Sequence, residues 1–136
     1  MARAAVCTEH PRLAMRKTAY VLLADAADRA RIDGALARCV DRVVFLGAID
    51  ELPAHPASDE ADCLILSAEP PETDAVKTID ALRRHGNDIP VIALGSHAAF
   101  RQAVHIARMD ATDVLERPVS DRELQQAVRR MCRARP

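Results

Sequence analysis

The stretch Asp62-Cys63-Leu64-Ile65-Leu66-Ser67 holds four consecutive apolar residues between two polar ones. A short, continuous apolar run is typical of a strand that is buried on both faces of a parallel sheet. Further segments with strand character lie on either side of it, at residues 19–24, 42–46, 89–94 and 112–115. The sequence therefore predicts five strands, and residues 63–66 form the third.

Helical periodicity separates these strands, with apolar residues at spacings of three and four that place them on one side of a helix. The inward-facing residues are expected to be Ile32, Ala35, Leu36 and Cys39; Ala75, Val76, Ile79 and Leu82; Phe100, Ala103, Val104 and Ala107; and Leu124, Ala127, Val128 and Met131. Asp74 can cap the second of these helices, and Ser120-Asp121-Arg122-Glu123 is a capping-box pattern that opens the last. In the segment 48–59, Pro53 and Pro56 disfavour a long helix, so only a helical turn or two is expected there.

Strands that alternate with helices across short connections predict a parallel sheet with helices on both faces. The predicted fold class is therefore α/β, with a doubly wound, five-stranded sheet. In such sheets ligands bind beside the carboxyl ends of the strands. The residues expected at that edge of the sheet are Asp25, Ser67, Gly95 and Arg117.

The chain has 136 residues, of which 49% are hydrophobic and 29% charged, and this composition fits one globular domain. We expect residues 1–17 to form a loose N-terminal extension and residues 18–136 to form the domain. The formal net charge of −1 argues against nucleic-acid binding by this domain. Four cysteines without CxxC spacing favour free thiols in a reducing compartment. Because no apolar segment reaches the length of a membrane span, we expect a cytoplasmic protein.

Two further blocks are informative: Ile89-Pro90-Val91-Ile92-Ala93-Leu94, and Asp113-Val114-Leu115-Glu116-Arg117-Pro118-Val119 followed by a helix. Together with residues 62–67 they resemble the receiver domains of bacterial response regulators, most of all those of the FixJ and NtrC type. The resemblance extends from Tyr20 to Arg133. It implies a flavodoxin-like (βα)5 fold with the strand order 2-1-3-4-5. It also implies a non-enzymatic role in two-component phosphorelay signal transduction and in the regulation of transcription.

Where the family places its phospho-accepting aspartate, this chain has Ser67. The family's acidic pair after the first strand binds Mg²⁺, and it is matched here by Ala24 and Asp25, which leaves one carboxylate. A serine hydroxyl needs an adjacent base before it is a useful nucleophile. Asp28 lies one turn further on and is expected to point away from the edge of the sheet. We therefore expect neither phosphorylation at Ser67 nor a Mg²⁺ cofactor.

Three other positions differ from the family's active edge. Gly95 stands in place of the small hydroxyl residue that contacts the phosphoryl group, and Arg117 replaces the lysine of the fifth loop. Val114 replaces the aromatic residue that changes rotamer on activation. The resemblance therefore points to a degenerate receiver, or pseudo-receiver, which has no catalytic residues and acts independently of phosphorylation.

The resemblance also implies that the fourth helix, the fifth strand and the fifth helix form an interaction face, drawn here from residues 98–133. Its charged residues are expected to include Arg101, Arg108 and Arg122. The expected partners are a sensor kinase, another regulator or a second copy of the chain. Two alternatives stay open: a working phospho-receiver with an unconventional site, and a small-anion sensor that binds an anion near Arg117.

Overall fold

Strands and helices alternate in the computed structural model, which describes residues 16–56, 59–68, 74–96 and 100–133. The strands are β1 (Arg16–Leu22), β2 (Arg42–Phe45), β3 (Glu60–Ser67), β4 (Val91–Gly95) and β5 (Thr112–Glu116). The helices are α2 (Ala26–Leu36), α3 (Ala75–Arg84), α4 (Phe100–Ile106) and α5 (Asp121–Met131), with a 3₁₀ turn, η1 (Ile49–Glu51), between β2 and β3. All strand pairs are parallel, in the order β2-β1-β3-β4-β5. This arrangement confirms the predicted fold class and strand order.

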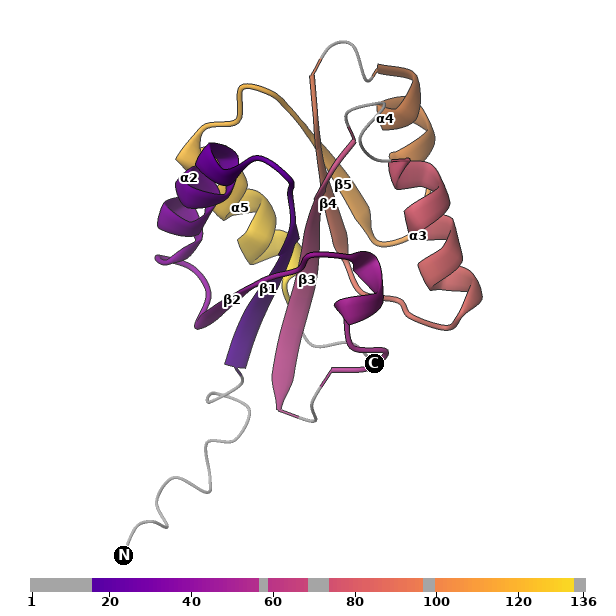
Figure 1. The fold of residues 1–136 in the computed structure, drawn as a ribbon, viewed down its shortest axis with the longest axis horizontal. Coiled ribbons are helices and arrows are strands. Elements are labelled where there is room, and N and C mark those ends of the chain that lie inside the picture. Colours follow the sequence, from indigo (N-terminus) through magenta and orange to yellow (C-terminus); the bar gives the residue numbers. More distant parts are fainter. Residues whose placement is uncertain (1–15, 57–58, 69–73, 97–99, 134–136) are drawn as a thin grey trace, which may run out of the picture.

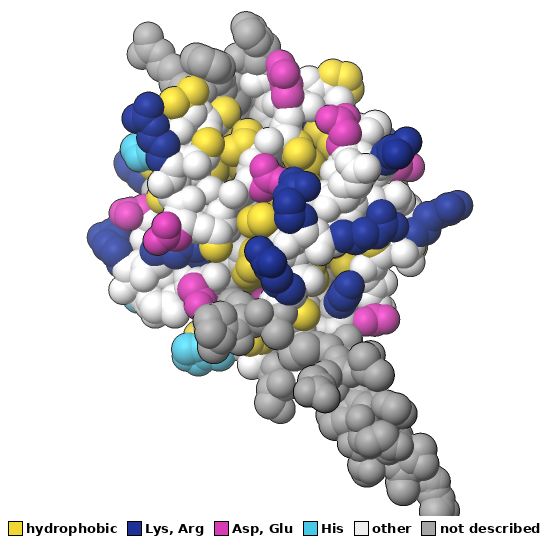
Figure 2. All heavy atoms as spheres, turned by 180° about the vertical axis from the view of Figure 1, so that it is seen from behind, with side chains coloured by type: hydrophobic (Ala, Val, Ile, Leu, Met, Phe, Trp, Pro, Cys, Tyr) yellow, Lys and Arg dark blue, Asp and Glu magenta, His cyan; other side chains and the backbone are white. Residues whose placement is uncertain are grey.

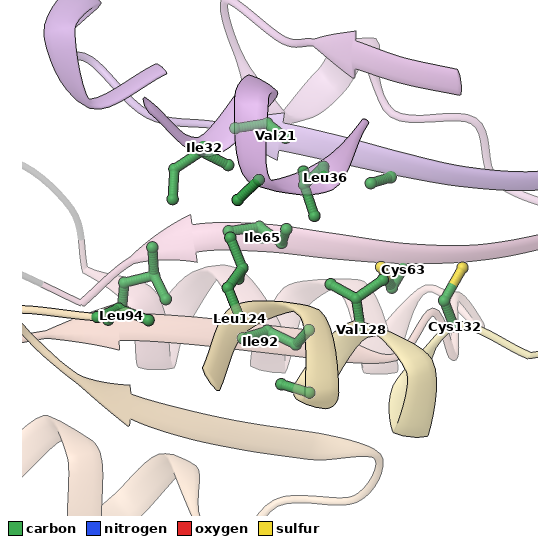
Figure 3. Packing of buried hydrophobic residues seen from close by; sticks show 14 of the residues in the cluster. Val21, Ile32, Leu36, Cys63, Ile65, Ile92, Leu94, Leu124, Val128 and Cys132 are labelled. Atoms are coloured by element: carbon green, nitrogen blue, oxygen red, sulfur yellow. The ribbon is translucent and has the colours of Figure 1, made fainter. Parts of the chain in front are cut away.

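Helices cover both faces of the sheet, with α2 and α5 on one side and α3 and α4 on the other (Figure 1). Successive side chains of a strand point to opposite faces, so β3 contributes to two separate cores. Cys63 and Ile65 pack in the core beneath α2 and α5, which Figure 3 shows together with Leu124. Leu64 and Leu66 pack in the core beneath α3 and α4. The continuous apolar run of the third strand is thus explained by burial on both faces.

Capping side chains set the ends of the helices, as the sequence predicts. Asp74 accepts a hydrogen bond from the Lys77 backbone N–H at 3.1 Å and begins α3. Ser120 and Glu123 form a complete capping box that begins α5. Gly86 follows the end of α3 with a φ of +81°, a left-handed conformation that glycine adopts without strain. These local interactions fix where α3 begins and ends. The capping box fixes where α5 begins, and hence how the preceding connection approaches that helix.

The side of α4 that faces the sheet differs from the predicted one. Ile106 is fully buried, whereas Val104 is 38% exposed and Ala107 is exposed. The prediction relied largely on alanines, which carry little apolar surface and therefore do not fix the phase of a helix. The prediction is wrong for Val104 and Ala107, whereas Ala103 is half-buried and the side chain of Phe100 lies outside the described residues. Val104 instead adds an apolar side chain to the surface.

Some element boundaries also differ from the predicted ones. β1 begins at Arg16, so Arg16 and Lys17 belong to the first strand, where they pair with Glu60 and Ala61 of β3. The hydrophobic pattern does not predict this extension, because its residues are polar and pair with β3 through the backbone. Between β2 and β3 the described residues form one short helical turn, η1, in line with the prolines that follow it. No helix in the described part of the chain combines the length and apolar character needed to cross a membrane.

Candidate functional site at the carboxyl edge of the sheet

A cavity of about 400 Å³ lies at the carboxyl edge of the sheet, beside the first turns of α2. The described residues that line it are Leu23, Ala24, Asp25, Ala27, Asp28, Arg31, Ser67 and Arg117. The structure therefore brings together three of the four predicted edge residues, Asp25, Ser67 and Arg117, which follow or end β1, β3 and β5. They come from three distant parts of the sequence, and the parallel order of the strands is what makes them neighbours.

Gly95 and Val114 are not among the described residues that line the cavity. The Gly95 carbonyl oxygen accepts a hydrogen bond from the Arg117 backbone N–H at 2.9 Å, which ties the end of β4 to the residue after β5. Val114 is half-buried in β5 and packs against the core beneath α3 and α4. Gly95 therefore positions the backbone of Arg117, and Val114 contributes to packing.

Asp25 has a structural role at the start of α2. Its Oδ1 accepts a hydrogen bond from the Ala27 backbone N–H at 2.9 Å, which makes it the N-cap of the helix. A carboxylate is favoured at this position because it satisfies a free N–H and faces the positive end of the helix dipole. One oxygen of the only retained family acid is thus engaged by the backbone.

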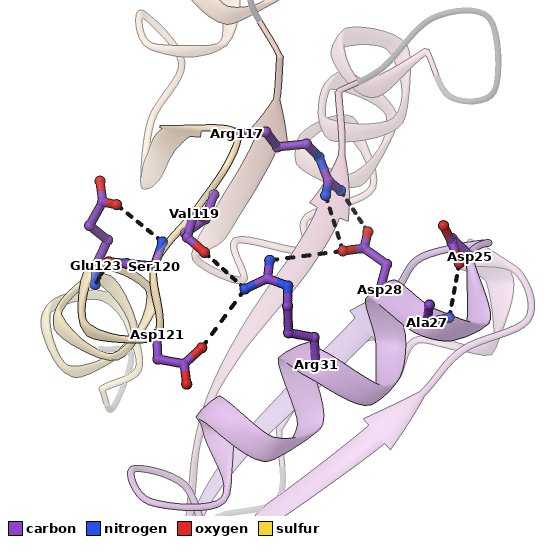
Figure 4. Close-up of polar contacts among 9 residues, drawn as sticks. All are labelled: Asp25, Ala27, Asp28, Arg31, Arg117, Val119, Ser120, Asp121 and Glu123. Carbon is purple, nitrogen blue, oxygen red and sulfur yellow. Dashed lines mark hydrogen bonds and ion pairs between the residues drawn. The ribbon is translucent and has the colours of Figure 1, made fainter.

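Asp28 points into the cavity, and the expectation that it points away is wrong. Its two carboxylate oxygens accept hydrogen bonds from the two terminal nitrogens of Arg117, at 3.1 and 2.8 Å (Figure 4). The side chains are only 15% and 23% exposed. Asp28 lies three positions after Asp25, and residues at this spacing share one side of a helix. Paired contacts between arginine and carboxylate are among the strongest hydrogen bonds in proteins.

Arg31 extends this network towards α5, and the sequence analysis missed it. Its Nη1 donates to the Val119 carbonyl oxygen at 2.9 Å and lies 3.8 Å from the carboxylate of Asp121. Its Nη2 lies 4.0 Å from Oδ1 of Asp28. The available signal was the spacing of three between Asp25, Asp28 and Arg31, which places all of them on one side of α2.

Ser67 is the last residue of β3 and is 8% exposed. Its position in the sheet is set by pairing with Leu94 of β4, whose carbonyl oxygen accepts a hydrogen bond from the Ala68 backbone N–H. The side chain adds no charge to the cavity. Among the described lining residues, two carboxylates therefore face two guanidinium groups, and their formal charges balance.

The residues of the cavity are a poor fit for Mg²⁺, the metal ion of the family's active edge. Mg²⁺ binds oxygen ligands in near-octahedral geometry and usually requires one or more available carboxylates. Both oxygens of Asp28 are bonded to Arg117, and one oxygen of Asp25 caps α2. Across the described ranges, no three His, Cys, Asp or Glu side chains are grouped so that they could hold a metal ion.

Comparison with known proteins identifies the family to which this chain belongs. The family model described as Response regulator receiver domain matches residues 37–129, which is more than half of the chain. The chain therefore belongs to the response regulator receiver domain family. This is a family of two-component signal transduction whose members generally have a signalling rather than an enzymatic role.

Individual relatives agree with this assignment. The sensor histidine kinase GacS of Pseudomonas protegens is 29% identical over 72 residues, which cover 49% of this chain and 8% of that protein. The response regulator receiver domain protein of Clostridium thermocellum has a TM-score of 0.72 at 14% identity, covering 85% of this chain and 94% of that one. Full-length FixJ from B. japonicum has a TM-score of 0.70 at 21% identity, covering 85% of this chain and 59% of that one. The structural likenesses show a shared fold, and the chain spans a small part of the kinase it matches.

Proposed function

We propose that this chain is a pseudo-receiver, which acts in two-component phosphorelay signalling through protein contacts that do not depend on phosphorylation. The observation that supports this function best is Ser67, a neutral and nearly buried hydroxyl at the position of the phospho-acceptor. Receiver chemistry requires a carboxylate there, because an ionised carboxylate can attack a phosphoryl group directly whereas a serine hydroxyl must first lose its proton.

The surroundings of Ser67 support the same proposal. The carboxylates that line the cavity with it are engaged, Asp25 as a helix cap and Asp28 in the ion pair with Arg117. Both carboxylate oxygens of Asp28 already accept hydrogen bonds from Arg117, which leaves this side chain poorly placed to take a proton from Ser67. We propose that the protein also needs no Mg²⁺, because the remaining oxygen atoms make a poor ligand set.

The first expected result concerns this chemistry. Treatment with acetyl phosphate and Mg²⁺ should leave the mass of the intact protein unchanged, because a serine hydroxyl, unlike a carboxylate, must lose its proton before it can attack a phosphoryl group. Mass spectrometry measures this directly, with a receiver domain that retains its aspartate treated in parallel. Addition of one phosphoryl group that is lost in Ser67→Ala but kept in Ser96→Ala would show instead a working receiver with an unconventional site.

The proposed interaction face consists of α4, β5 and α5. Figure 2 shows the molecule from behind, with basic side chains through the middle and right of the view and acidic ones among them. Exposed Val104 lies beside His105, Arg108 and Met109 around a hollow at the C-terminal end of α4. Across the face, Arg130 of α5 forms an ion pair with Asp113 of β5. Mixed charges around exposed apolar groups are a common composition for a protein contact.

We expect constitutive association through this face, either as a homodimer or with a sensor kinase or another regulator. Reversal of Arg108, Arg122 and Arg101, whose side chain lies outside the described residues, to glutamate should weaken association by about tenfold or more, because a partner surface that complements arginine repels glutamate. Light scattering and pull-down against cognate kinases, with and without beryllofluoride, provide the measurement. Arg38→Glu, an exposed change after α2, serves as the control. A monomer whose partner binding ignores the three reversals would place the interaction face elsewhere.

A further inference from the structure

The connection between β5 and α5 is tied to α2 at two points. The first is the bidentate contact between Arg117 and Asp28, with both side chains largely buried. The second is Arg31, whose guanidinium group donates to the Val119 carbonyl oxygen two residues further along the connection. Figure 4 shows these contacts as one continuous network that runs from α2 across the connection to the start of α5.

Two further hydrogen bonds restrain the start of the connection between β5 and α5 and the helix that follows it. The Arg117 backbone N–H donates to the Gly95 carbonyl oxygen, so the residue cannot shift without losing a bond to β4. Gln125 in α5 donates to the Ala35 carbonyl oxygen of α2 at 3.0 Å. The position of α5 relative to α2 is therefore coupled to the ion pair in the cavity. Because α5 belongs to the proposed interaction face, the cavity and the face are mechanically linked.

We propose that Asp28 is an internal anion that occupies the guanidinium group of Arg117 and, with Arg31, latches the connection between β5 and α5 to α2. The latch holds α5 in one position without any added phosphoryl group. It also masks an anion site, since Arg117 and Arg31 lie in the same cavity and Asp28 supplies the negative charge that a phosphate ion would bring. This inference rests on the proposed function, because a protein that received a phosphoryl group would need Arg117 to be released from Asp28.

Amide hydrogen exchange tests the latch. Asp28→Asn and Arg117→Gln should each raise the exchange rate of the backbone amides of residues 117 and 119–124 by about tenfold or more, because each removes charge-assisted hydrogen bonds. The double variant should exchange no faster than the single ones, since two residues that act as one pair give non-additive effects. Asp80→Asn is the matched control, because Asp80 pairs with Arg84 at 3.1 Å on exposed α3.

Two comparisons separate the loss of the ion pair from other effects of the substitutions. Asp28 lies in the first turn of α2, where its charge also favours the helix itself, but Arg117→Gln leaves that charge in place. Unchanged exchange in Arg117→Gln, or an equal change in Asp80→Asn, would overturn the latch. Effects that add in the double variant would show that the residues act separately and would likewise overturn it.

Titration with inorganic phosphate tests the masked anion site. By calorimetry, Asp28→Asn should bind phosphate at least about tenfold more tightly than the native protein, because a competing and repelling carboxylate is gone. Equal affinity in the two proteins would overturn the masking. Tight binding by the native protein would also overturn it and would favour a small-anion sensor. The acetyl phosphate experiment is separate: modification of Ser67 would refute the proposed function, whereas unchanged hydrogen exchange refutes only the latch.

Discussion

Replacement of Leu124 by alanine is expected to lower the free energy of unfolding by about 2–5 kcal/mol. Leu124 is fully buried and projects from α5 into the core that it shares with Ile65 and Ile92 (Figure 3). Alanine would remove apolar surface from the core and leave a cavity that the surrounding side chains fill only partly. We expect α5 to lose the most stability, because Leu124 packs this helix against the sheet.

Urea denaturation followed by circular dichroism measures this change, and Gln126→Ala on the exposed side of α5 is the control. That variant should change stability by less than about 0.5 kcal/mol, as is usual for surface positions. A loss below about 1 kcal/mol for Leu124→Ala would mean that α5 is held mainly by polar contacts. Partner binding should weaken together with stability in Leu124→Ala if α5 belongs to the interaction face.

Replacement of Glu60 by alanine is expected to lower the free energy of unfolding by about 2–3 kcal/mol. Glu60 is 6% exposed at the amino end of β3, opposite the cavity, and accepts hydrogen bonds from the hydroxyls of Thr18 and Tyr20 at 2.8 and 3.4 Å. Burial, and after it the charge of Glu60, raises the pKa of Tyr20, so the phenol keeps the proton that it donates. Alanine would leave two buried donors without their acceptor. The ion pair with Arg42 adds less, because the Arg42 side chain is 47% exposed.

Glu60→Gln separates the contribution of the hydrogen bonds from that of the charge. Glutamine keeps a carbonyl oxygen for one of the two hydroxyls and turns an NH2 group towards the other, whose oxygen can accept from it. The ion pair is lost, so the cost should be about 1 kcal/mol. Thermal or urea unfolding of the two variants side by side provides the measurement. Equal losses in both would show that charge is the main factor, and a negligible loss in Glu60→Ala would show that water satisfies the two hydroxyls.

The sheet and most of its helices were predictable because their signals are local. Residues 63–66 are continuously apolar because both faces of β3 are covered, and the capping box at Ser120 depends on residues three positions apart. The inward side of α4 was not predictable, because its alanines suit either side and only packing against β4 and β5 selects Ile106. The start of β1 at Arg16 likewise depends on pairing with Glu60, a residue far along the chain.

The candidate site was likewise predictable only in part. Ser67 at the end of the third strand, Asp25 after the first and Arg117 after the fifth were predictable from the sequence, because each position follows from its own apolar run. The orientation of Asp28 towards the cavity, and its contact with Arg117 at a separation of 89 residues, depend instead on the three-dimensional packing. Such an ion pair depends on how the connection between β5 and α5 crosses α2, and that path follows from packing of both helices on one face of the sheet. Periodicity reports which side of a helix is apolar, but it holds no information on which charged partner lies opposite the polar side.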